Sequence, residues 1–118
     1  MFDTLRLKWR IMRDVSALVR WRQVDDFQRV LKASFNGLSK LGDSRIDRHT
    51  PWSSSTGGML LWAYCEAATH LGLHTELFEM LSQWRPTYLE WMKGRLTPEE
   101  SKYFAWFEEV FQQGKPTS

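Results

Sequence analysis

The chain has 118 residues, the size of one domain, and with 42% hydrophobic and 25% charged residues it is too apolar for an intrinsically disordered protein. Its longest apolar run, Met59 to Cys65, is too short to cross a bilayer, and its start lacks the apolar segment of a secretory signal. Because Cys65 is the one cysteine, an intrachain disulfide and a multi-cysteine zinc site are excluded. We therefore expect one soluble domain in a reducing, cytoplasmic setting. The formal net charge of the chain is +2.

The first predicted element is an amphipathic helix that begins at Asp3 or Thr4, either of which can cap it. One side of this helix carries its apolar residues, which are Leu5, Trp9, Ile11, Met12, Val15, Leu18 and Val19. We expect this stripe to be buried. The opposite side is basic and carries Arg6, Arg10, Arg13 and Arg20.

Three interpretations of the basic side remain open. With Arg22 and Trp21 nearby, it could follow phosphates while Trp21 stacks on a base, or it could lie on an anionic membrane. It could also be the solvated side of a core helix, with its arginines paired to Asp3, Asp14 and glutamates of a neighbouring helix. The small net charge favours the solvated side.

A second helix is predicted from an N-cap at Asp25 or Asp26 to about Leu41, with Gly42 as the residue after its end. No Gly or Pro separates it from the first helix, so one continuous helix is the alternative. The apolar stripe would drift along such a helix, and we therefore prefer a basic hairpin or a kinked helix over residues 1–42.

Residues 43–58 are predicted to be a long Ser/Gly loop, since they contain Pro51, Gly57, Gly58 and the hydroxyl run from Ser53 to Thr56. The run resembles a phosphate-binding nest in composition, but no Lys accompanies it. The favoured interpretation is that Ser55 or Thr56 caps the next helix, while Trp52 folds back onto that helix.

The next helix, Met59 to Leu71, is apolar on nearly every side and is predicted to be buried at the centre of the fold. Glu66 and His70 lie four residues apart on its one polar strip. Such a pair could perform acid–base chemistry or hold a metal. The favoured interpretation is a buried pair in which each side chain satisfies the other, or a His near the C-terminal end of the helix that the helix dipole stabilises.

Three further helices complete the chain, and with the preceding one they form an aromatic-rich bundle over residues 59–113. The first of the three runs from Thr75 to Trp84, and Pro86 is predicted to begin a separate short helix that ends at Gly94. Tyr88 and Trp91 on this short segment are candidate exposed anchors. The last helix begins with a capping box, Thr97 to Glu100, and ends before a tail at residues 114–118.

Charge and aromatic content bear on function. Residues 1–48 carry a net charge of +5 and residues 49–118 one of −3, which points to an anionic partner near the N-terminus or to self-association of unlike halves. The chain also holds seven Trp, seven Phe and three Tyr, more than a small core requires, so part of this set is expected to face a protein.

The sequence therefore predicts an all-α single domain of about five helices over residues 1–118. We expect a non-enzymatic accessory subunit, adaptor, inhibitor or assembly factor that binds a protein partner or its own copies. It should need no cofactor, metal or small-molecule substrate. The candidate interface residues are Tyr88, Trp91 and Trp21. The alternative is a nucleic-acid-binding subunit, with peripheral membrane contact less favoured, and its candidate residues are Arg6, Arg10, Arg13, Arg20 and Arg22.

Overall fold

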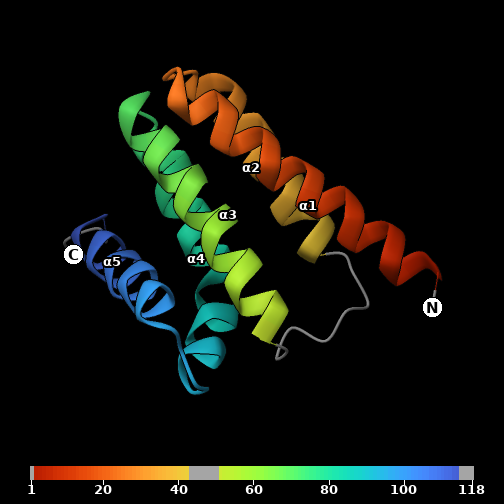
Figure 1. Cartoon of the computed structure of the whole chain (residues 1–118). Helices are drawn as coiled ribbons and strands as arrows, with labels where there is room; N and C mark the ends of the chain where they lie inside the picture. Colours follow the sequence, from red (N-terminus) through yellow and green to blue (C-terminus); the bar gives the residue numbers. More distant parts are fainter. Residues whose placement is uncertain (1, 43–50, 115–118) are drawn as a thin grey trace.

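The computed structural model describes residues 2–42 and 51–114, and within these ranges it contains helices and no strand (Figure 1). This confirms the predicted all-α bundle of about five helices. The helices are α1 (Phe2–Gln23), α2 (Phe27–Gly42), α3 (Pro51–His70), α4 (His74–Met92) and α5 (Pro98–Gly114).

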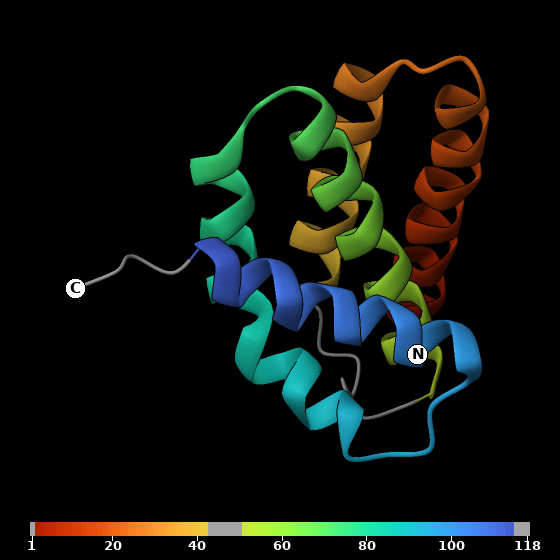
Figure 2. The same ribbon diagram turned by 90° about the vertical axis from the view of Figure 1, so that its left-hand side faces the viewer.

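The central element is α3, which contacts all four other helices. α1 and α2 form an antiparallel hairpin, and α2 packs between α1 and α3. α4 returns along the other side of α3, and α5 lies across α3 and α4 (Figure 2). Because α1 packs mainly on α2 and touches α3 only slightly, a large part of the α1 surface has no neighbour in the described fold.

A tight turn separates α1 from α2. Asp25 adopts the left-handed conformation, with φ at 56°, which aspartate tolerates better than most residues. The next amide, that of Asp26, donates to the carbonyl of Trp21 over 2.9 Å, and the Asp26 carboxylate accepts from the amide of Arg29 over 3.3 Å. Asp26 is therefore the N-cap of α2, as one of the two predicted candidates.

The predicted loop over residues 43–58 is wrong for residues 51–58, which form the first two turns of α3. Residues 43–50, including His49, lie outside the described residues, as does the side chain of Trp52. Since the hydroxyl run lies inside the helix, neither the predicted cap at Ser55 or Thr56 nor a phosphate nest exists there. Pro51 is instead the first residue of the helix, a position that proline suits.

Small residues in this part of α3 let other helices come close. A β-carbon added to Gly57 would lie 2.3 Å from the ring of Trp91 on α4, and one added to Gly58 would lie 3.5 Å from Phe104 on α5. Ser54 and Thr56 are also buried. The Ser/Gly composition, which is typical of loops, here serves close packing of helices.

α4 is one helix, so the prediction that Pro86 begins a separate helix is wrong. Pro86 lacks the amide that would bond to the carbonyl of Ser82, four residues earlier, but both residues are exposed and water can reach that carbonyl. Beyond the proline, Tyr88 and Trp91 pack into the core and hold the helix in place. Burial therefore outweighs the local cost of proline.

The capping box at the start of α5 is confirmed and has an additional member. The amide of Thr97 donates to Glu100 Oε1, and the amide of Glu100 donates to Thr97 Oγ1, both over 3.1 Å. Ser54 Oγ on α3 donates to the other oxygen of the same carboxylate over 2.8 Å. The cap thus links the start of α5 to the start of α3, which explains why Glu100 is buried.

Candidate interaction surface

The aromatic residues predicted as exposed anchors are in the core. Tyr88 is 0% and Trp91 4% exposed, and they pack with Trp84, Phe104 and Phe107 where α4 meets α5. The prediction that they face solvent is therefore wrong. The segment that follows Pro86 packs against α3 and α5, and its aromatic side chains complete the core there.

The Tyr88 hydroxyl has a polar partner within the fold. It donates to Glu108 Oε1 over 2.5 Å, while Arg85 donates to both oxygens of the same carboxylate over 2.8 and 3.2 Å. Burial, followed by the bond to Glu108, raises the pKa of Tyr88 above its ordinary value. Hydrogen bonding from Arg85 lowers the pKa of Glu108. This cluster ties α4 to α5.

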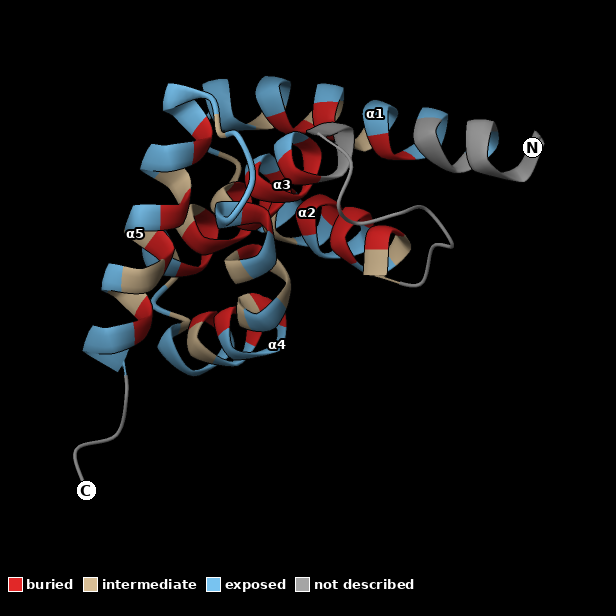
Figure 3. Ribbon diagram, turned by 90° about the horizontal axis from the view of Figure 1, so that it is seen from below, coloured by how far each residue is buried: buried red, intermediate tan, exposed pale blue. Residues whose placement is uncertain are grey.

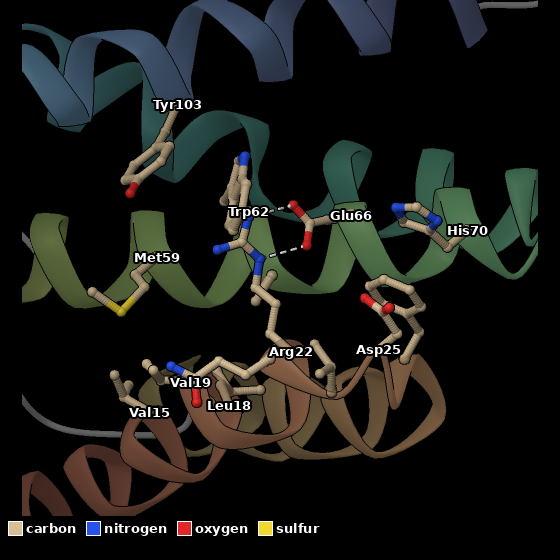
Figure 4. A pocket seen from close by; sticks show the side chains of 14 residues that line it. Val15, Leu18, Val19, Arg22, Asp25, Met59, Trp62, Glu66, His70 and Tyr103 are labelled. Atoms are coloured by element: carbon tan, nitrogen blue, oxygen red, sulfur yellow. Dashed lines mark hydrogen bonds and ion pairs between the residues drawn. The ribbon is translucent and has the colours of Figure 1, made fainter.

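A surface depression lies between α1 and α3. It is an open groove of about 540 Å³ with α2 beneath it. Its walls are mostly apolar (Figure 4). The main apolar contributors are Val15 and Val19 from α1, Met59 and Trp62 from α3, and Tyr103 from α5.

Arg22 crosses this groove from the C-terminal end of α1 (Figure 4). Its guanidinium donates to the two oxygens of Glu66 on α3 over 2.7 and 3.2 Å and lies 4.4 Å from the centre of the Trp62 ring. The hydrogen bond to Glu66 raises the pKa of Arg22 above its ordinary value. Arg22 was predicted to belong to an anion-binding face, but it is committed to Glu66 and holds α1 against α3.

Glu66 and His70 do not satisfy each other as predicted, because Glu66 pairs with Arg22. His70 instead stacks on Phe27 of α2, with ring centroids 4.1 Å apart and planes 4° apart. In the described ranges, no group of three His, Cys, Asp or Glu side chains is placed to hold a metal ion.

The apolar stripe of α1 is divided between the core and solvent, which the sequence analysis did not anticipate. Ile11 and Leu18 are buried against the bundle. Trp9, Met12 and Val19 were expected to join them but are 72%, 47% and 54% exposed. Figure 3 shows exposed stretches alternating with buried ones along the described part of α1. The stripe is too wide for one contact, since α2 covers only one flank of α1, and its width in the sequence was the signal that part of it stays exposed.

The basic side of α1 is exposed as predicted, but its arginines do not pair with Asp14 or with a described glutamate as the favoured interpretation required, and the side chain of Asp3 lies outside the described residues. Asp14 pairs with Lys40 of α2 over 2.7 Å rather than with an arginine. No ion pair involving the basic face is found in the described part of the chain. This face consists of Arg6, Arg10, Arg13 and Arg20, all exposed. Trp21, the third predicted interface aromatic, is half-buried against the core.

Comparison of the chain with protein-family models, with curated proteins and with solved structures finds no match. Among the described helices, none combines the length and the apolar character that a membrane crossing requires. The described surface combines an exposed apolar row on α1, a neighbouring apolar groove, and arginines beside the row.

Proposed function

We propose that this protein is a small protein-binding module, an accessory subunit or adaptor, that engages its partner through α1 and the groove beside it. The observation that carries the proposal is the exposure of Trp9, Met12 and Val19 on one helix. Val19 also lines the groove, and Met12 lies two turns before it on the same side of α1. Apolar and aromatic groups gathered on a surface in this way are typical of protein interfaces.

Partner capture by point variants tests this proposal. We expect Trp9→Ala and Met12→Glu to lose proteins that co-purify with the wild-type chain from its own cells, because both remove apolar contact while leaving the core unchanged. Met92→Glu is the matched control, since Met92 is exposed to a similar degree, 37% against 47% for Met12, but lies at the end of α4. All variants should unfold with the wild-type midpoint. Equal capture by Met12→Glu and Met92→Glu would refute the proposal.

A second candidate function, nucleic-acid binding, has one observation in its favour: the four exposed arginines of α1 have no ion pair in the described residues. If Arg6, Arg13 and Arg20 contact phosphates, their replacement by Gln should lower the slope of log affinity on log salt by about three units, near one per contact. If the protein-binding proposal holds, oligonucleotide binding should be weak and absent at physiological salt.

A further inference from the structure

The exposed residues of α1 follow a seven-residue repeat. Along the helix, the steps between Trp9, Met12, Ser16 and Val19 are three, four and three residues. This alternation of three and four residues is the spacing at which one helix packs against another in a coiled coil. All four are exposed. The buried residues Ile11 and Leu18 have the same seven-residue spacing but face the bundle. α1 therefore has two seams with this spacing: a buried apolar one, and an exposed one in which Trp9, Met12 and Val19 are apolar and Ser16 is polar; only the first is occupied in the described fold.

Arginines border the free seam on its solvent side. Arg13 directly follows Met12 and Arg20 directly follows Val19, so each lies about 100° further around the helix than the apolar residue before it. Arg6 continues the same row one repeat earlier. Successive arginines in this row are about 10.5 Å apart along the axis. On its other side, the seam is bordered by the apolar groove and by Arg22, whose charge Glu66 already neutralises.

We infer that the occupant of this seam is a single amphipathic helix of another protein, with acidic side chains along one flank of its apolar stripe. This inference rests on the proposed function and specifies the partner. A helix laid along α1 would cover Met12 and Val19 and reach into the groove. Carboxylates that recur every seven residues on it would meet Arg6, Arg13 and Arg20, in the manner of flanking charges in paired helices.

A second copy of the chain does not fit this description. Two α1 helices packed seam to seam would bring their arginine rows together, and like charges at such positions disfavour pairing. The acidic half of a second copy, residues 49–118, does not supply a matching apolar stripe either. The described part of α5 has no exposed large apolar side chain, and α4 has Met92 alone. The partner therefore supplies both the apolar stripe and the acidic flank.

A library of displayed helical peptides of about 21 residues, six turns, tests the inference. The peptides carry a varied apolar stripe, and each flanking position is Glu, Gln or Lys. Selection on the wild-type protein should enrich Glu at the flank. The best peptides should bind at least about tenfold more tightly than their Lys-flanked counterparts at low salt, with a smaller ratio at high salt. The doubly substituted protein Arg13→Glu, Arg20→Glu should reverse the preference toward Lys. Arg95→Glu, which changes an exposed arginine in the α4–α5 connection, should leave it unchanged.

The outcomes separate the inference from the proposed function. If the selected helices need Trp9 and Met12 but have neutral or basic flanks, the seam binds helices and the acidic-partner inference is wrong. If Trp9→Ala and Met12→Glu select the same peptides as the wild type, both fail. If no helix is selected while partner capture still depends on Met12, the inference fails and the proposed function stands. Formation of a stoichiometric dimer that Arg13→Glu strengthens would replace the inference with self-association.

Discussion

Gly57 should tolerate no side chain, although it lies inside a helix where Ala is ordinarily preferred. A β-carbon at this position would lie 2.3 Å from Cη2 and 2.8 Å from Cζ3 of Trp91, and 3.1 Å from a methyl of Leu41. Carbon atoms in favourable contact are about 3.5–4.0 Å apart, so the overlap with the ring exceeds about 1 Å. Trp91 is buried among Trp84 and Phe104 and has no space into which to move.

The neighbouring glycine provides the control. A β-carbon at Gly58 would lie 3.5 Å from Phe104, an ordinary contact. Ala in place of Gly in a helix interior stabilises the fold by about 1 kcal/mol, and this gain applies to both Gly57→Ala and Gly58→Ala. Overpacking at Gly57 costs up to about 3 kcal/mol. We therefore expect Gly58→Ala to be about 1 kcal/mol more stable than wild type, and Gly57→Ala to be about 2 kcal/mol less stable.

Urea unfolding followed by far-ultraviolet circular dichroism measures both free energies of unfolding, provided that the slopes agree. Trp91→Phe removes the part of the ring that the new β-carbon would strike. In the double variant, part of the loss caused by Gly57→Ala should therefore disappear, with a coupling of at least about 1 kcal/mol. A Gly57→Ala protein as stable as Gly58→Ala would show that α3 and α4 do not pack as described.

Three further outcomes test other parts of the fold. Glu100→Ala should cost about 1–3 kcal/mol in urea unfolding, because it leaves buried polar groups without their partner, whereas Glu99→Ala, at an exposed position, should change stability by less than about 0.5 kcal/mol. Because the pKa of Glu108 is lowered in the fold, its ionised form stabilises the fold above its ordinary pKa of 4.5, and this contribution is lost as the pH falls through the lowered value. The stability difference between wild type and Glu108→Gln should therefore be largest near neutral pH and should shrink below pH 4.5. Leu61→Ala should cost about 2–5 kcal/mol, and Trp62→Ala, at a half-buried position on the groove, should cost less; the reverse order in thermal melts would contradict the orientation of α3.

Local signals in the sequence were sufficient for several features of the fold. The all-α class followed from apolar periodicity, and the cap at Asp26 and the capping box at Thr97 followed from side chains that act on their own neighbouring amides. Such features depend on contacts within one turn. They are therefore readable without knowledge of the tertiary structure.

The features that the sequence did not predict depend on packing between distant segments. Gly57 and Gly58 read as loop residues, and only the approach of Trp91 and Phe104 shows why α3 needs them. In the same way, Pro86 remains within α4 because the aromatic residues beyond it are buried.

The candidate surface was missed for a related reason. Periodicity places Met12 on the apolar side of α1, but it does not say how much of that side α2 will cover. The exposure of Met12 follows from the slight contact between α1 and α3, which is a property of the whole bundle.

The central claim is that a partner protein lies on the free seam of α1 and in the groove beside it. Photo-cross-linking from single sites tests this claim directly, with p-benzoylphenylalanine placed at Met12 or Val19, or at the exposed control positions Phe35 on α2 and Met92 on α4. We predict that, in the chain's own cells, a protein cross-links from Met12 and Val19 and not from the two controls. Cross-links that arise equally from Phe35 or Met92, or that join α1 to nucleic acid instead of protein, would contradict it.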